Sequence, residues 1–176
     1  MEKTLEIRLC GSGGQGLILA AGILSSVMIA KGMNVSQSQS YEPTSRGGLS
    51  RSDLVISEQV VDYPLANNLD FAVVLHQIAV ADCDGFLQPS ATIITDVKTV
   101  TEPPKGDFKV IELPIADAAL KLGNRRVANI IALAALCAVG NLSEREMLEQ
   151  VVAQRSPAAF KELNQEALAV GWDMVS

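Results

Sequence analysis

Four glycines within six residues are the part of this sequence best suited to binding chemistry. They are Gly11, Gly13, Gly14 and Gly16. A short apolar segment precedes them and a long apolar run, residues 17–30, follows them. Glycine lets the backbone turn sharply and lets a ligand approach its N–H groups. Because a helix starting after the loop would point its unpaired N–H groups and its positive dipole end at the same place, the loop is a candidate anion site, with phosphate the usual ligand.

The spacing of these glycines fits G-x-G-x-x-G, which is also found in dinucleotide-binding domains. Those domains place an acidic residue about 20 positions later, at the end of their second strand. Here the second strand is expected over residues 34–39, and Glu42, the next acid along the chain, lies 26 residues after Gly16. The pattern therefore disfavours NAD. Two alternatives stay open, the phosphate of another ligand and glycines that only allow a strand and a helix to pack closely.

Residues that could perform catalysis are scarce. His76 is the single histidine, so a mechanism that needs two is excluded, and it is expected to be a hydrogen-bonded residue at the rim of a site. Three cysteines without a C-x-x-C pair argue against a structural zinc or an iron–sulfur cluster held by this chain. We expect no catalytic residue and no metal ligand on this chain alone.

A second candidate binding segment runs from Ser40 to Arg51. It has neither helical nor strand periodicity and is rich in turn residues, which predicts a long functional loop. It carries Tyr41, Arg46 and the pair Gly47-Gly48.

The elements that must position these segments indicate an α/β protein. Hydrophobic residues make up 48% of the chain and aromatic residues only 4%. The apolar run Asp70–Leu75 is typical of a central parallel strand, residues 78–86 are expected to form a short helix, and the chain is expected to be helical from Pro114 onward. Within that helical part, Ser143 and Glu146 have the spacing of a capping box at the start of a helix. We expect one domain, residues 1–176, with a three-layer, Rossmann-like, open and mostly parallel sheet, helices on both faces and a helical C-terminal third.

The net charge and the hydropathy of the chain exclude some classes of binding partner. The net charge of −6 argues against a nucleic-acid or anionic membrane surface. The apolar run 17–30 is shorter than the roughly 20 residues that a membrane span needs. The scattered cysteines favour a reducing compartment, and the N-terminus has no signal-peptide pattern, so a cytoplasmic location is expected.

Several motifs in this order resemble the gamma subunit of 2-oxoacid:ferredoxin oxidoreductases. They are Gly11–Gly16, Ser40-Tyr41…Arg46-Gly47-Gly48, Tyr63-Pro64, Gly123-Asn124…Asn129 and Asn164…Gly171. The resemblance implies a cytoplasmic complex that oxidatively decarboxylates a 2-oxoacid to its acyl-coenzyme A. It also implies alpha, beta and possible ferredoxin-like delta subunits, which carry most of the residues for thiamine diphosphate and iron–sulfur clusters, with ferredoxin as electron acceptor. Self-association of the isolated chain stays open.

By the same resemblance, this chain helps to receive coenzyme A but holds no cofactor tightly alone, and its glycine loop and Arg46 face either phosphates or a partner subunit. The implied binding residues are Gly11, Gly13, Gly14, Gln15, Gly16, Tyr41, Arg46, Gly47, Gly48 and Asn129. Glu42 and Thr44 depart from the glycine and glutamate of the family loop, and an added acid there would weaken anion binding.

The segments Arg51–Asp53 and Asp62–Pro64 look most like the members that use 2-oxoglutarate, while pyruvate and branched-chain members share the framework. Two other readings stay open, a free-standing Rossmann-like nucleotide-binding protein and an interaction module whose loop is vestigial.

Overall fold

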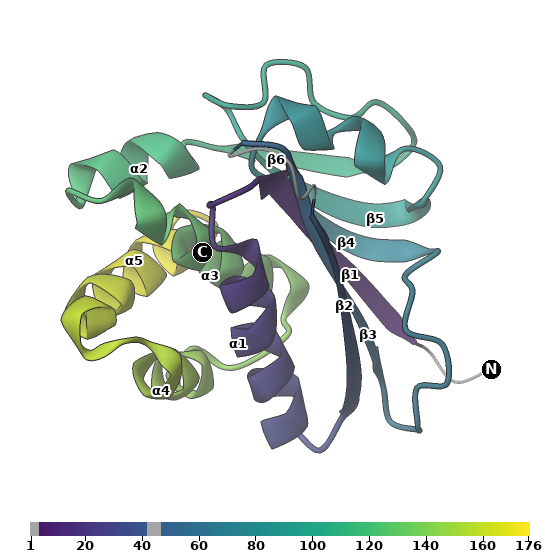
Figure 1. Ribbon diagram of the computed structural model, residues 1–176, viewed down its shortest axis with the longest axis horizontal. Coiled ribbons are helices and arrows are strands. Elements are labelled where there is room, and N and C mark those ends of the chain that lie inside the picture. Colours follow the sequence, from purple (N-terminus) through teal and green to yellow (C-terminus); the bar gives the residue numbers. More distant parts are fainter. Residues whose placement is uncertain (1–3, 42–46) are drawn as a thin grey trace.

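A six-stranded sheet forms the centre of the molecule (Figure 1). The computed structural model describes residues 4–41 and 47–176. The strands lie in the order β2-β3-β1-β4-β5-β6. Their bounds are β1 (Leu5–Ser12), β2 (Asn34–Tyr41), β3 (Leu49–Ser57), β4 (Leu69–Val74), β5 (Leu87–Asp96) and β6 (Lys109–Leu113).

The strand directions place the carboxyl ends of several strands at one edge. β1, β4, β5 and β6 pair in parallel, and β3 is antiparallel to both β1 and β2. Within the described residues, β3 is thus the one strand that runs in the opposite direction. Since Ser12 pairs with Leu49, the start of β3 lies beside the end of β1. The glycine loop and Gly47-Gly48 therefore meet at this edge.

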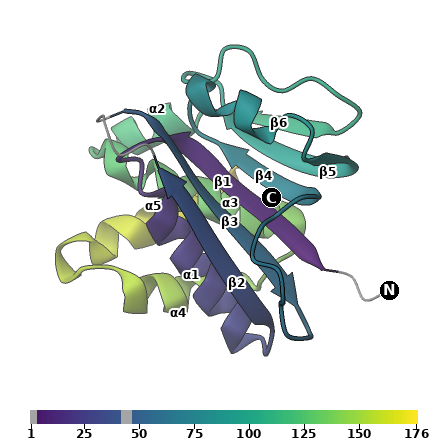
Figure 2. The ribbon, with the colours of Figure 1, turned by 45° about the vertical axis from the view of Figure 1, so that its right-hand side comes forward.

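The helices are distributed unevenly over the two faces (Figures 1 and 2). One face carries α1 (Leu17–Ala30), α2 (Ile115–Lys121), α3 (Ala128–Gly140), α4 (Arg145–Arg155) and α5 (Lys161–Asp173). The other is covered by two short 3₁₀ helices, η1 (Gln77–Ala79) and η2 (Ala81–Cys83). The α/β class and the helical C-terminal region are confirmed. Among the described residues, no helix combines the length and hydropathy needed to cross a membrane.

Helices α3 and α5 pack closely because of a glycine. A Cβ on Gly171 would overlap the carbonyl oxygen of Ile131, so the two backbones approach to a distance that only glycine allows. Nine of the 13 residues of α3, those from 129 to 137, are buried. This contact gives a physical reason for the glycine in the Asn164…Gly171 motif.

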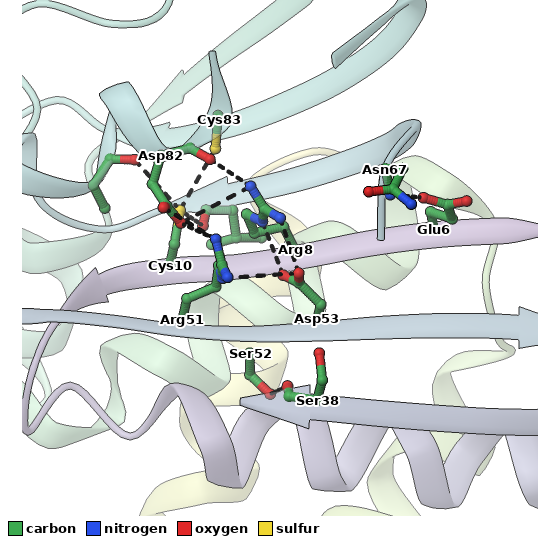
Figure 3. Close-up of polar contacts among 12 residues, drawn as sticks. Glu6, Arg8, Cys10, Ser38, Arg51, Ser52, Asp53, Asn67, Asp82 and Cys83 are labelled. Atoms are coloured by element: carbon green, nitrogen blue, oxygen red, sulfur yellow. Dashed lines mark hydrogen bonds and ion pairs between the residues drawn. The ribbon is translucent and has the colours of Figure 1, made fainter. Parts of the chain in front are cut away.

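A buried charge network holds the opposite face together (Figure 3). Arg8 donates to both carboxylate oxygens of Asp53, at 2.8 and 2.9 Å, and the two side chains are only 1% and 2% exposed. Arg51 pairs with Asp82 of η2 at 3.1 Å, and Arg8 also donates to the Asp82 carbonyl. The ring centroid of Phe86 lies 4.7 Å from the guanidinium carbon of Arg8. Although burial alone would lower it, the pKa of Arg8 is raised by its contact with Asp53.

Two local predictions were wrong. The segment Ser40–Arg51 is not a loop throughout, because β2 continues to Tyr41, which pairs with Ser50 of β3, while residues 42–46 lie outside the described part of the chain. Antiparallel pairing gives hydrogen-bond partners to the backbone N–H and C=O groups of these residues, and this does not depend on their polar side chains. The helix expected over 78–86 is instead the pair of 3₁₀ helices η1 and η2.

Candidate anion-binding site

The glycine loop turns directly from β1 into α1. The N–H of Gly13 donates to the carbonyl of Gly48 at 2.8 Å, which joins the loop to the start of β3. Gly14 and Gly16 have φ angles of 91° and 74°, in the left-handed region that favours glycine. Among the residues that the structure describes, no side chain caps α1. Its first N–H groups therefore have no intrahelical partner and add a partial positive charge beside the loop.

Gln15 gives the loop its shape. Its Oε1 accepts the N–H of Ser12 at 2.6 Å, and its Nε2 donates to the carbonyl of Leu75 at 2.9 Å. Both polar atoms of the amide are engaged within the protein. The side chain thus fastens the loop to the end of β4.

Asn129 brings the start of α3 beside the start of α1. Its side chain is buried, its Nδ2 donates to the carbonyl of Gly16 at 2.9 Å, and its Oδ1 accepts the N–H of Ile130 at 2.9 Å. A Cβ on Gly16 would lie 2.5 Å from Asn129 Nδ2. Two helix N-termini are therefore held at one place by a close, buried contact.

Most of the predicted binding residues come together here. The ones that meet around the loop are Gly11, Gly13, Gly14, Gln15, Gly16, Gly47, Gly48 and Asn129. Gly47 has a φ of 97°, and a Cβ there would lie 3.8 Å from Ser12 Oγ. The side chain of Tyr41 and the whole of Arg46 fall outside the described residues, as do Glu42 and Thr44.

Two cavities adjoin the loop, with volumes of about 210 and 340 Å³. Gly14 and Arg126 line both. The smaller also has apolar walls from α1, η3 (Arg125–Val127) and η4 (Ala158–Phe160). The larger is lined by further cations, Arg125 and Lys98. A ligand with an anionic part and an apolar part would match this pair of cavities.

Arg125 and Arg126 are binding candidates that the sequence reasoning missed. Both side chains are exposed, and within the described part of the chain neither has an ion-pair partner. They precede α3 at its N-terminal end, where the helix dipole disfavours cations. Helix stability therefore does not explain them. The sequence feature that could have identified them is the Arg-Arg pair inside the Gly123-Asn124…Asn129 motif.

His76 makes a local hydrogen bond. Its Nδ1 accepts the N–H of Ile78 at 3.3 Å and so caps η1. Over residues 4–41 and 47–176, no group of three or more His, Cys, Asp or Glu side chains is arranged to hold a metal ion.

The sheet order argues against a dinucleotide site of the usual kind. In such domains the second strand lies parallel and next to the first, so that its terminal acid reaches the ribose. Here β3 lies between β1 and β2. An acid at the end of β2 would stand two strands away from the glycine loop.

Comparison with known proteins finds relatives that match nearly the whole chain. The chain is 33% identical over 174 residues to the 2-oxoglutarate synthase subunit KorC of Archaeoglobus fulgidus, covering 99% of this chain and 89% of that one. It superposes on the gamma subunit of a keto/oxoacid ferredoxin oxidoreductase from Geobacter sulfurreducens with a TM-score of 0.88 and 36% identity, covering 98% and 97% of the two chains.

A larger protein contains the same fold. The 2-oxoglutarate:ferredoxin oxidoreductase of Magnetococcus marinus, solved with 2-oxoglutarate, coenzyme A and succinyl-CoA bound, gives a TM-score of 0.87 at 20% identity. The match covers 99% of this chain and 31% of that one.

These findings define the class of protein as a subunit of an oxidoreductase complex. The family pattern described as pyruvate ferredoxin/flavodoxin oxidoreductase matches residues 6–174, and the chain belongs to that family. The resemblance to gamma subunits that the sequence motifs indicated is confirmed.

Proposed function

We propose that this chain is the gamma subunit of a 2-oxoglutarate:ferredoxin oxidoreductase and that its glycine loop receives phosphate groups of coenzyme A. The side chains of Arg125 and Arg126, which have no ion-pair partner among the described residues, lie beside the start of α1 and are the observation that carries the ligand proposal. The full-length similarity to a 2-oxoglutarate synthase subunit supports the choice of 2-oxoacid.

Coenzyme A suits the chemistry of the site. Its pyrophosphate and ribose phosphate are anions that helix N–H groups and arginines bind well. Its adenine and pantetheine parts are less polar, as are Leu19, Val127 and Phe160 around the smaller cavity. The Magnetococcus enzyme of similar fold was solved with coenzyme A bound.

The roles of this chain in the proposed complex are binding and positioning. Gln15 and Asn129 hold the loop in shape, and the backbone of the glycines faces the ligand. Tyr41, Arg46 and Gly47 would complete the site from the β2–β3 connection. Residues 1–176 would act as one domain of a cytoplasmic complex.

The chemistry would belong to the partner subunits. Alpha, beta and ferredoxin-like delta chains would hold thiamine diphosphate and iron–sulfur clusters, and ferredoxin would take the electrons. This chain would contribute no catalytic residue, so alone it would not decarboxylate a 2-oxoacid.

The test is steady-state kinetics of the co-expressed complex carrying Arg125→Gln and Arg126→Gln together. Losing two charge-assisted contacts, each worth about 1.5 kcal/mol, should raise the KM for coenzyme A by tenfold or more. The KM for 2-oxoglutarate should stay the same.

Lys109→Gln is the matched control, because Lys109 is exposed at the start of β6, the end opposite the site. An unchanged KM for coenzyme A in the double variant would contradict the phosphate site. Faster turnover of pyruvate or a branched-chain 2-oxoacid than of 2-oxoglutarate would contradict the assignment of 2-oxoglutarate as the substrate. Tight binding of NAD or FAD by the isolated chain would favour a free-standing nucleotide-binding protein.

A further inference from the structure

Two buried cysteines meet on the face opposite the α-helices (Figure 3). Cys10 is in β1, directly before the first glycine of the loop, and Cys83 ends η2. Their sulfur atoms are 3.6 Å apart although 73 positions separate them in sequence. Both side chains are 0% exposed. The proposed function uses neither thiol.

The elements that carry the two thiols are attached to the sheet in different ways. β1 is a central strand paired on both sides, whereas η2 is a three-residue helix that contacts the sheet through the ion pair of Asp82 with Arg51 and the hydrogen bond from Arg8 to the Asp82 carbonyl. A disulfide has an S–S distance of about 2.05 Å, so the sulfurs must approach by roughly 1.5 Å. A shift of η2 toward β1 would supply that approach without disturbing strand pairing.

We propose that Cys10 and Cys83 form a redox-modification site that a peroxide oxidises to an intrachain disulfide. One sulfur attacks the peroxide, breaks its O–O bond and becomes a sulfenic acid, and one water is released. The second sulfur then displaces the hydroxyl of the sulfenic acid to form the S–S bond and a second water. Overall, two thiols lose two electrons and two protons, and one hydrogen peroxide becomes two waters.

Burial protects the pair while η2 is closed. The contact with Cys83 and the removal from water both raise the pKa of Cys10, so little reactive thiolate is present. Oxidation therefore proceeds through local opening of η2. Once one sulfur has reacted, the neighbouring thiol is the nearest nucleophile, and this favours the intrachain bond over other products.

The bond would link the strand that leads into the glycine loop to the segment that holds Asp82. In the reduced protein, Asp82 pairs with Arg51 and lies close to Arg8. Cross-linking would hold η2 against the sheet, and its amides should exchange hydrogen more slowly.

The experiment uses the full chain, reduced and then treated with hydrogen peroxide. After denaturation, the free thiols are alkylated, counted by mass and located by peptide mapping. The expected product has lost two of its three free thiols, contains a peptide joining Cys10 to Cys83, and is restored by dithiothreitol. Cys137, which is buried on the other face, is the internal control and should remain alkylatable.

Two variants make the result decisive. Cys83→Ala should lose the linked peptide, and Asp82→Asn should speed its formation because η2 is held less firmly. The proposal is overturned if both thiols stay free at a peroxide dose that oxidises the urea-unfolded chain, or if folded protein yields only interchain bonds or bonds to Cys137. Hydrogen exchange of residues 77–86 that is equal in the two redox forms would refute the clamping of η2.

Discussion

Replacing Asp53 with leucine should destabilise the fold far more than removing an exposed charge, because it leaves the Arg8 guanidinium buried without its carboxylate. The two side chains are 1% and 2% exposed and are joined by two contacts of 2.8 and 2.9 Å. They come from paired strands, with Arg8 directly opposite Asp53 in the sheet. The arginine cannot reach water without separating β1 from η2.

The magnitude follows from this burial. Removing one partner of a buried ion pair costs about 3–5 kcal/mol. Arg8 would keep the carbonyl of Asp82 and the ring of Phe86, so the loss should be near 3 kcal/mol, at the lower end of that range. The exposed pair of Arg145 and Glu149 is the matched control, and Glu149→Gln should cost far less than Asp53→Leu.

Urea unfolding followed by circular dichroism measures both losses as differences in the free energy of unfolding. The single variant Arg8→Met and the double variant Arg8→Met with Asp53→Leu complete a double-mutant cycle. Because apolar side chains of similar volume need no desolvation of charge, the double variant should recover most of the stability. A loss of unfolding free energy below about 1 kcal/mol in Asp53→Leu would refute this account. So would a double variant whose loss equals the sum of the losses in Arg8→Met and Asp53→Leu.

Three further changes test the packing and the titration of single residues. Gly171→Ala should lower the free energy of unfolding by about 3 kcal/mol, because its Cβ overlaps the Ile131 carbonyl. Gly22→Ala on α1 is the helical control, and equal thermal midpoints for the two variants would contradict the close packing of α3 and α5. Gly16→Ala should cost about 2 kcal/mol in urea unfolding, since its φ of 74° strains any side chain. Burial raises the pKa of Cys137 from near 9 to about 12, so above pH 9 the unfolded chain binds fewer protons than the folded one. Stability should then fall by up to about 1.4 kcal/mol per pH unit until pH 12, and Cys137→Ala should flatten this slope in urea midpoints at pH 8 and 10. An identical slope in the variant would show that other groups cause the loss.

Local patterns determined the class of fold and the position of the loop. Glycines at 11, 13, 14 and 16 between two apolar segments predicted a strand, a turn and a helix, and these are present as β1, the loop and α1. The run Asp70–Leu75 similarly predicted the central strand β4, observed over Leu69–Val74. Such signals depend on residues a few positions apart, which one stretch of sequence contains in full.

The sequence was less informative where pairing between distant segments outweighs the secondary-structure preference of the local residues. The polar residues of β2 suggested a short strand and a long loop, but β3 supplies backbone partners as far as Tyr41. Ser143 and the acid three positions on predicted a capping box, yet α4 starts after Glu144 without a side-chain cap. For β2, the observed structure depends on tertiary pairing with β3.

The sequence by itself determined an α/β chain with a glycine loop and, through its motifs, the oxidoreductase family. Only the tertiary structure decided which side chains face one another. It placed Arg125 and Arg126 beside a loop more than 100 positions away, set Arg8 opposite Asp53, and brought Cys10 to Cys83. The physical reason is that strand register sets Arg8 opposite Asp53, while the packing of η2 and η3 against the sheet and the loop sets the other neighbours, and both depend on the whole chain.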